Sequence, residues 1–239
     1  MQPFSRRRFL FTASAALATA RISRADQQEI VPELLDHILI GSPDLDKGIA
    51  FVEERTGVRA AFGGVHPGAG TRNALLSLGA NRYLEIIAPD PAQPNTEDKR
   101  NLRSLEEPVI VGWAQHPGDI EAFAQRLKGE GVEVVGPAPG SRKRPDGRVL
   151  HWKTLALKDD ADGLFPFFIE WGSGSMHPSV DAPQGCTLEF FEAIAQEKKL
   201  SEVRLRADQL NLDLKISHGH GPNLHAIIAG PKGRLNIYF

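Results

Sequence analysis

The 239-residue sequence contains a single cysteine, no excess of basic charge and no long apolar run beyond its N-terminal segment. One cysteine excludes an internal disulfide, and we expect Cys186 to be a small buried hydrophobic side chain. A formal net charge of −2 and an isoelectric point near 6.5 provide no basic surface for nucleic acid. Without a later apolar stretch that could cross a bilayer, the sequence predicts no stable membrane anchor.

The first residues have the pattern of an export signal. Ser5-Arg6-Arg7-Arg8-Phe9-Leu10 contains a twin-arginine pair, the apolar stretch 9–20 follows it, and no acidic residue precedes Asp26. That stretch is too short for a membrane-spanning helix, which needs roughly 17–25 residues. Residues 1–25 resemble a twin-arginine (Tat) signal peptide, with cleavage after Ala20 or Ala25 both open. The resemblance implies contact with the Tat export machinery and a periplasmic or secreted protein.

After this segment the apolar pattern alternates between strand and helix periods, twice in the same order. The first unit, 34–90, begins with a strand over 35–40. Asp44 then opens a helix whose stripe of Leu45, Ile49 and Val52 ends at Gly57. Three further strands complete a βαβββ unit, at 58–62, 73–78 and 83–88.

The second unit, 108–175, repeats this order with its helix opening at Asp119. Its strands are predicted at 108–113, 132–135, 149–157 and 165–171. Aligning Asp44 with Asp119 gives an offset of 75 residues, whereas Glu85 and Glu170 are 85 apart. We assign the ten additional residues to loops at 137–148 and 158–164.

The remainder predicts a linker and a third, shorter unit. Residues 176–185 are rich in Pro, Ser and Gly, which is typical of a linker. Residues 186–239 carry a strand pattern, a helix pattern over 200–210 and three more strand patterns. We expect a βαβββ-like C-terminal unit.

Two predicted strands each place one carboxylate between apolar neighbours, that of Glu85 and that of Glu170, and a third strand carries the imidazole of His37. An isolated ionised carboxylate buried in an apolar strand costs far more free energy than it returns. The repeated arrangement therefore points to a shared partner, most simply a metal ion.

Two βαβββ units in tandem, with His37 on a first strand and Glu85 on a fourth, resemble the vicinal oxygen chelate (VOC) superfamily. Four segments resemble its glyoxalase-like branch: GGVHPGAGTRNAL (63–75), YLEIIAPD (83–90), GSRKRPDG (140–147) and FIEW (168–171). The resemblance implies an α+β fold in which the two units form a U-shaped, eight-stranded mixed sheet around a metal.

The resemblance also implies a ligand set from the first and fourth strands of each unit. By position these ligands are His37, Glu85 and Glu170, and the residue that matches His37 in the second unit is Gly112, which has no side chain. One imidazole and two carboxylates suit Zn, Mn, Ni or Fe. The gap at Gly112 is open to water, to substrate, or to a histidine from elsewhere, with His66, His116 and His151 as candidates. Dioxygenase chemistry is disfavoured, since the relatives that perform it use a second histidine there.

The leading hypothesis is an exported metalloenzyme, a lyase or isomerase that moves a proton on a small carbonyl or hydroxy compound. Glu170 is the expected base and His66 a proton shuttle, although the glycines and proline beside His66 are equally typical of a turn. The expected substrate-binding residues are Asn73, Trp152, Arg142 and Arg144. For the two arginines, a solvated hairpin with an Asp146-Gly147 turn is the alternative.

A metal-free small-molecule binding protein is the rival hypothesis. Some relatives of this fold sequester drugs in the pocket between paired units, and four aromatic residues are candidates for lining such a cleft: Tyr83, Trp113, Trp152 and Phe168. In either case we expect a small-molecule partner, and a homodimer is left open.

Overall fold

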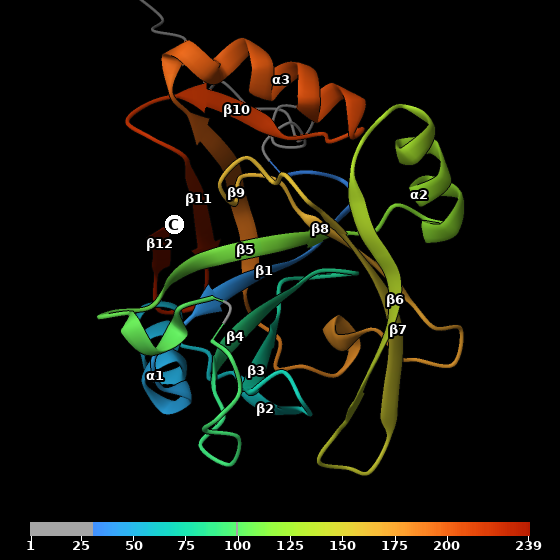
Figure 1. The fold of residues 1–239 in the computed structure, drawn as a ribbon. Helices are drawn as coiled ribbons and strands as arrows, with labels where there is room; N and C mark the ends of the chain where they lie inside the picture. Colours follow the sequence, from blue (N-terminus) through green and yellow to red (C-terminus); the bar gives the residue numbers. More distant parts are fainter. Residues whose placement is uncertain (1–30, 99) are drawn as a thin grey trace, which may run out of the picture.

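The computed structural model describes residues 31–98 and 100–239, so the predicted signal peptide lies outside the described residues. Figure 1 shows the ribbon, in which two β-sheets and three α-helices make up the described part of the chain. The first unit contains β1 (Leu35–Gly41), α1 (Leu45–Thr56), β2 (Ala61–His66), β3 (Thr71–Ser77) and β4 (Tyr83–Pro89). The second contains β5 (Val109–Gln115), α2 (Ile120–Gly129), β6 (Val134–Lys143), β7 (Val149–Leu157) and β8 (Phe167–Trp171). The third contains β9 (Thr187–Ala195), α3 (Leu200–Gln209), β10 (Lys215–His218), β11 (Asn223–Ala229) and β12 (Arg234–Tyr238).

The first two units form one eight-stranded mixed sheet with the strand order β2-β3-β4-β1-β5-β8-β7-β6. Within each unit the first strand pairs in parallel with the fourth, as β1 does with β4 and β5 with β8. The two units meet where β1 and β5 pair antiparallel, so the strand order of the second unit mirrors that of the first. This arrangement confirms the predicted fold class and its tandem βαβββ units.

The helix boundaries follow from capping side chains that the sequence already indicates. The carboxylate of Asp44 accepts a hydrogen bond from the backbone N–H of Lys47, and Gly57 ends α1 with a left-handed φ of 82°. Asp119 caps α2 in the same way by accepting from the N–H groups of Glu121 and Ala122. The two aspartates therefore mark the residues at which α1 and α2 begin.

Strand alternation gives the large sheet two different faces. Ile38 and Ile40 of β1, with Leu84 and Ile86 of β4, are buried in the hydrophobic core that the helices cover. His37 and Leu39, with Tyr83, Glu85 and Ile87, line a cavity on the opposite face. The same alternation therefore builds the core on one face and a polar cleft on the other.

The third unit has the predicted element order but pairs its strands differently. Its sheet has the order β10-β9-β11-β12, so β9 lies between β10 and β11 and does not pair with the last strand. Phe191 of β9 packs against Trp113 of β5, with ring centroids 5.1 Å apart. The second sheet therefore covers part of the first two units' core, and Trp113 lies in that core.

The predicted loop over 137–148 is largely wrong. Strand β6 runs to Lys143 and pairs with β7, which leaves only 144–148 for the hairpin turn. Pro137 and Pro139 obscured the strand pattern in the sequence. They are tolerated because β6 is the last strand of the sheet, and Pro137 lies where the pairing with β7 is interrupted between Val135 and Ala138. In the part of the chain described, no helix combines the length and apolarity that a membrane span requires.

Candidate functional site

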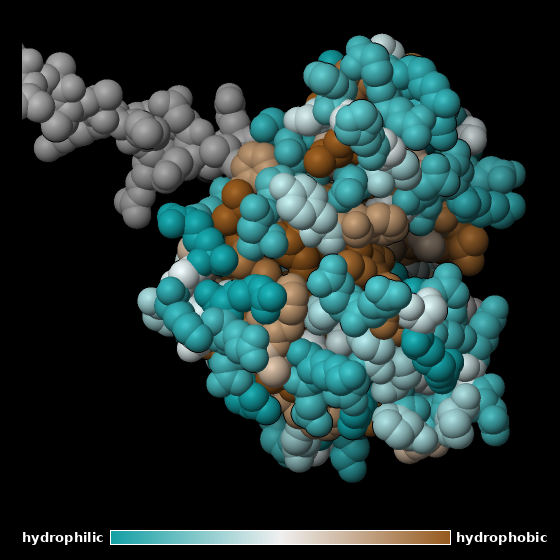
Figure 2. Space-filling model, turned by 90° about the vertical axis from the view of Figure 1, so that its left-hand side faces the viewer, coloured by the Kyte–Doolittle hydropathy of each residue, from teal (hydrophilic) through white to brown (hydrophobic). Residues whose placement is uncertain are grey.

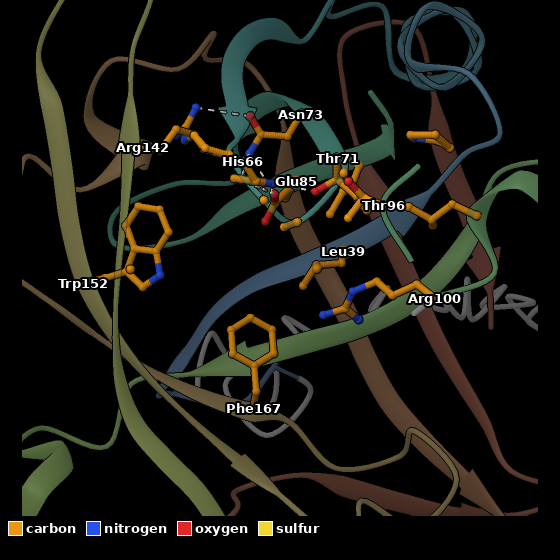
Figure 3. Close-up of a pocket in the computed structure, with 18 of the residues that line it drawn as sticks. Leu39, His66, Thr71, Asn73, Glu85, Thr96, Arg100, Arg142, Trp152 and Phe167 are labelled. Carbon is orange, nitrogen blue, oxygen red and sulfur yellow. Dashed lines mark hydrogen bonds and ion pairs between the residues drawn. The ribbon is translucent and has the colours of Figure 1, made fainter. Parts of the chain in front are cut away.

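The concave face of the large sheet forms a cavity of about 740 Å³ between the first two units. Its residues come from both units, with His37, Glu85 and His66 from the first and Trp152 and Phe167 from the second. Figure 3 shows His66 and Glu85 gathered at one side of this cleft, with Trp152 and Phe167 facing them. The cleft therefore combines a polar cluster with an aromatic wall.

His37 is held rigidly at the floor of the cleft. Its side chain is 2 % exposed, and its Nδ1 donates to Oδ1 of Asp36 over 2.6 Å. Its ring stacks on Tyr83 with centroids 4.4 Å apart. Because Nδ1 is committed to Asp36, Nε2 is the nitrogen that faces the cleft, 3.5 Å from Oε2 of Glu85.

Asp36 lies next to His37 on the same strand, yet the two side chains meet. From Leu35 to His37 the pairing advances by only one residue on β5, so Asp36 is the extra residue of a β-bulge. Its second oxygen accepts from Nε1 of Trp171 at 3.0 Å and lies 3.2 Å from Nε2 of His177.

Asp36 is therefore a charged group held inside the protein. Burial raises the pKa of its carboxyl, but the hydrogen bonds with His177 and His37 outweigh this and hold the pKa far below its usual range. The ionised carboxylate orients His37, and neither Asp36 nor His177 was among the residues selected from the sequence. The adjacent Asp-His pair was the available signal for Asp36.

Glu85 is buried beside His37, and an amide and a guanidinium extend its network. Nδ2 of Asn73 donates to Oε1 of Glu85 over 2.7 Å, and Nη1 of Arg142 donates to Oδ1 of Asn73 over 3.2 Å. Burial raises the pKa of Glu85, but attraction to His66 and His37 in their protonated forms and the Asn73 hydrogen bond lower it overall. Glu85 is thus ionised at neutral pH. Asn73, a predicted substrate ligand, joins Glu85 to Arg142 across the cleft.

Gly63 of the first unit leaves the space that this network occupies. A Cβ at Gly63 would lie 2.5 Å from both Nη1 of Arg142 and Oδ1 of Asn73. Glycine therefore lets the edge strand of one unit approach Arg142 of the other. Arg142 is 3 % exposed and lines the cleft, and its role in substrate binding stays a prediction.

His66 lies at the same cluster, with Nε2 3.8 Å from Oε1 of Glu85 and Nδ1 2.9 Å from Oγ1 of Thr71. Burial lowers its pKa; Glu85 opposes this, whereas Arg142 and Arg100 lower the pKa further. His66 is therefore neutral at neutral pH, a state that can accept or relay a proton.

The pKa of His66 predicts a pH effect on stability. Because the folded-state pKa lies below the ordinary 6.5, the unfolded chain binds more protons once the pH falls below that value. This contribution is complete above pH 6.5 and is lost as the pH falls from there through the folded-state pKa. We expect His66→Gln to remove this contribution. As the pH is lowered from about 8 to about 5, the free energy of unfolding should therefore fall further for wild type than for the variant. Urea denaturation at the two pH values measures this, and a constant difference would contradict it.

An arginine from outside the repeated units lies beside the gap at Gly112. A Cβ at Gly112 would lie 3.5 Å from Nη1 of Arg100, and the same nitrogen donates to the carbonyl of Val111 over 3.1 Å. Figure 3 shows the guanidinium of Arg100 pointing into the cleft between Leu39 and Phe167. A cation thus lies beside the position where the sequence left a fourth ligand open.

Glu170 does not join the cleft, and this corrects its predicted roles as metal ligand and base. Phe167, Ile169 and Trp171 of β8 line the cavity, so the alternation turns Glu170 to the opposite face. There its Oε2 accepts from the N–H of Ile120 over 2.7 Å, at the start of α2. A carboxylate at a helix N-terminus is stabilised by the unpaired N–H groups and the helix dipole.

The expected metal set is therefore not assembled. His37 and Glu85 lie together, but Glu170 is on the other face, and no three His, Cys, Asp or Glu side chains of the described residues are arranged to hold a metal ion. Arg100 and Arg142 add two guanidinium cations to the cleft, which favour an anion over a divalent cation. The donor set does not fit the metal that the resemblance implied.

Replacing Glu170 tests this correction. Glu170→Ala removes an acceptor at the start of α2, so we expect the free energy of unfolding to fall by about 0.5–2 kcal/mol. The metal content of the purified protein is expected to equal that of wild type. Urea denaturation and elemental analysis measure the two quantities, and metal that is present in wild type but lost in the variant would restore Glu170 as a ligand.

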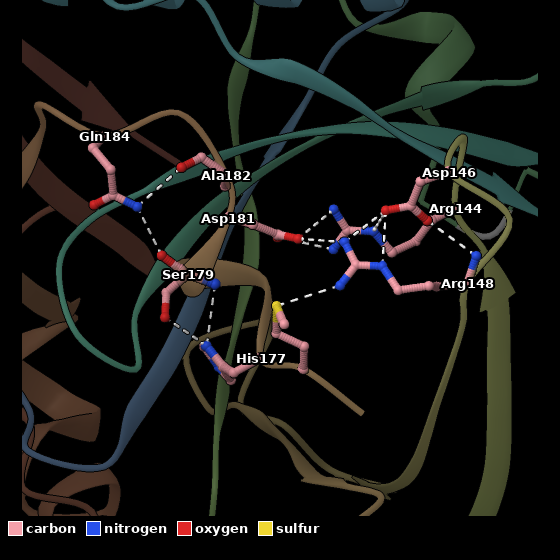
Figure 4. A network of polar contacts seen from close by, with 9 residues as sticks. Arg144, Asp146, Arg148, His177, Ser179, Asp181, Ala182 and Gln184 are labelled. Atoms are coloured by element: carbon pink, nitrogen blue, oxygen red, sulfur yellow. Dashed lines mark hydrogen bonds and ion pairs between the residues drawn. The ribbon is translucent and has the colours of Figure 1, made fainter. Parts of the chain in front are cut away.

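The remaining predicted residues divide between the cleft and the surface. Trp152 lines the cleft and packs on Trp171, whereas Arg144 forms ion pairs with Asp146 and Asp181 in the network of Figure 4. Arg144 therefore belongs to the hairpin of its alternative interpretation, although its side chain is only 16 % exposed within this ion-pair network.

Three further predicted side chains do not line the cavity: His116, His151 and Phe168. The backbone of His151 is bonded to Ser175, and Phe168 packs against Phe123 of α2. Of the three histidines considered for the gap, only His66 lines the cleft.

The segment between the second and third units forms part of the site. His177 and Ser179 lie at the short helix Pro178–Val180, where Nδ1 of His177 is 2.8 Å from Oγ of Ser179 (Figure 4). The carbonyl of Ser179 accepts from Oγ of Ser77 on β3. This predicted linker is thereby docked on the first unit and brings His177 to Asp36.

Fold and cleft together define a protein of the glyoxalase-like class, with two βαβββ units around a polar site. The family model described as a glyoxalase-like domain matches residues 35–209, and the chain belongs to this family. Family and fold place it in the VOC superfamily, as the sequence resemblance implied. A comparison with curated proteins found no significant match.

Solved structures agree with this fold. A hypothetical protein from Staphylococcus aureus is 22% identical with a TM-score of 0.60, over 86% of this chain and 84% of that one. Methylmalonyl-CoA epimerase from Mycobacterium tuberculosis is 20% identical with a TM-score of 0.42, over 59% and 89%. A methylmalonyl-CoA epimerase in complex with methylmalonyl-CoA and NH4+ is also similar, at 20% identity and a TM-score of 0.44, over 61% and 99%. At these identities the likeness concerns the fold alone.

Proposed function

We propose that this glyoxalase-like protein is an isomerase or lyase that moves a proton on a small carbonyl or hydroxy compound. The observation that carries the proposal is the buried series Asp36, His37 and Glu85. Asp36 holds Nδ1 of His37, and Nε2 of the same ring faces the cleft beside Glu85. A carboxylate that orients an imidazole is a common arrangement for a general base. His37 thus takes the role that the sequence assigned to Glu170.

The chemistry requires no oxidant or reductant. Nε2 of His37 takes the proton from a carbon next to the carbonyl, and the electron pair of the broken C–H bond moves onto the carbonyl oxygen. Glu85, 3.5 Å away, stabilises the imidazolium, while Arg142 stabilises the negative oxygen. The proton returns to the same or a neighbouring carbon in an isomerase, or a leaving group departs in a lyase.

Deuterium exchange tests this proposal even though the substrate is unidentified. The full-length protein, freed of its N-terminal segment if export removes it, is incubated in D2O with neutral and anionic small hydroxy and oxo compounds. We expect NMR to detect deuterium next to the carbonyl of one class of compound. Exchange that is absent for every compound, although one of them binds in the cleft, would contradict an enzyme.

A metal-free binding protein is the second candidate, and the aromatic wall favours it. Trp152 and Trp171 pack with ring centroids 5.6 Å apart, and Tyr83 and Phe167 line the same cavity. Such a wall suits a flat, apolar ligand. Quenching of tryptophan fluorescence by an aromatic compound that is recovered unchanged supports this candidate.

We also propose that the protein is exported through the Tat pathway. The support is the sequence pattern alone, Arg6 and Arg7 followed by an apolar stretch. Changing both arginines to lysine is expected to keep the protein in the cytoplasmic fraction of a Tat-competent bacterium. Export that is unchanged by the double substitution would contradict this proposal.

A further inference from the structure

Two guanidinium groups in the cleft form no ion pair with any carboxylate of the described residues. Arg142 is 3 % exposed, and it donates to the neutral amide oxygen of Asn73. Arg100 donates to the neutral carbonyl of Val111. A cation inside a protein is costly unless an anion accompanies it, and this cost applies to Arg142. Arg100 is exposed, so its guanidinium is open to a negative group from the solvent.

The two arginines lie on opposite sides of the acid–base cluster. Figure 3 shows Arg142 beside Asn73 at one end and Arg100 beside Phe167 at the other, with Glu85 and His66 near Arg142. Both charges act on His66, since each lowers its pKa. A ligand that contacts both arginines must pass across His66 and Glu85.

The two positions differ in what they can hold. Arg142 and Asn73 are joined to Glu85 and face the reacting end of the cleft. Arg100 lies over Gly112 and is not hydrogen-bonded to that network, and the missing side chain leaves room for a group to approach the guanidinium. A planar guanidinium binds a carboxylate through two parallel hydrogen bonds. Arg100 is thus suited to anchor a carboxylate while Arg142 meets the reacting oxygen.

The cleft that holds the two arginines also has an apolar wall. Phe167, Leu39 and Trp152 line it, and Phe167 also packs edge-on against His37. A planar body would fill this space and place its reacting carbon near His37.

We infer that the substrate is a carboxylic acid with a flat, unsaturated or aromatic body, and that its carboxylate binds Arg100 in the space beside Gly112. This inference rests on the proposed function for the reaction, but the anion site can be tested alone. Arg100 lies outside both predicted units, and no role was predicted for it from the sequence.

Benzoate and benzamide are the probes, because they share a shape and differ in charge. Titration calorimetry on the full chain is expected to give benzoate an affinity roughly tenfold higher than that of benzamide, as for a carboxylate hydrogen-bonded to a guanidinium. Arg100→Gln is expected to reduce this preference to near unity, and Arg100→Lys to retain part of it. Arg126→Gln on the outer surface of α2, where Arg126 pairs with Glu130, is the matched control and should keep the preference.

Equal affinities for the two probes in wild type would overturn the inference, and so would an undiminished preference in Arg100→Gln. The latter result would mean that Arg100 only ties its segment to Val111. His37→Gln separates the two proposals, since benzoate binding should survive while deuterium exchange is lost. An Arg100-dependent preference without exchange on any compound supports the carboxylate site and rejects the enzyme. Deuterium exchange on neutral compounds without a preference for benzoate supports the enzyme and rejects the carboxylate site.

Discussion

His37→Gln is expected to lower the rate of deuterium exchange by about 10²–10⁴-fold, the usual contribution of a positioned general base. Glutamine can still donate a hydrogen bond to Asp36, so the buried carboxylate keeps one partner. It cannot accept a proton at the position of Nε2, which faces Glu85 in the cleft. The expected loss is therefore one of chemistry, with the fold retained.

Two measurements distinguish a loss of chemistry from a loss of the fold. Near-ultraviolet circular dichroism should be unchanged, since Trp152 and Trp171 report packing around the cleft. His151→Gln is the matched control: it replaces a histidine on β7 that does not line the cavity, and its exchange rate should equal that of wild type. A His37→Gln protein that keeps more than about a tenth of the wild-type rate would show that another group is the base.

Asp36→Ala is expected to lower the free energy of unfolding by about 3–5 kcal/mol, as when one partner of a buried charged pair is removed. The substitution leaves the donors of His37 and Trp171 without their acceptor and frees Nε2 of His177 from its contact. Urea denaturation measures this change. Asp146→Ala removes an exposed carboxylate that pairs with Arg148, and no comparable loss is expected there.

The pH dependence identifies the charge as the cause. The pKa of Asp36 in the folded protein lies below its ordinary value of 3.8, so its stabilising effect is present above that pH. It is lost as the pH falls toward the folded-state pKa, where the folded protein also binds the proton. The difference between wild type and Asp36→Ala should therefore be constant at neutral pH and shrink in acid. A loss of stability that does not change in acid would indicate a packing defect.

The local elements of both units were predictable because short-range chemistry determines them. Asp44 and Gly57 delimit α1 as the sequence indicated, and alternation placed Glu85 and Tyr83 on one face of β4. On β4 the opposite face carries only apolar residues, so the polar face could be recognised. His37 and Glu85 were therefore brought together in the structure as the repeat suggested.

Strand β8 shows where this reasoning stops. Phe167, Phe168, Ile169 and Trp171 are all apolar, since one face meets α2 and the other meets the cleft. Both faces are covered, so alternation carries no information about which one contains Glu170. The superfamily resemblance suggested the cleft, and the observed side chain caps α2 instead.

By itself the sequence determined the fold class, the two repeated units, the helix boundaries and the presence of His37 and Glu85 on adjoining strands. These properties depend on hydrophobic periodicity and capping, which act over a few residues. Only the tertiary structure decided that Arg100 lies beside Gly112, that His177 reaches Asp36 and that Glu170 leaves the site. These contacts join residues that are far apart in the sequence, and hydrophobic periodicity, which acts over a few residues, cannot predict them.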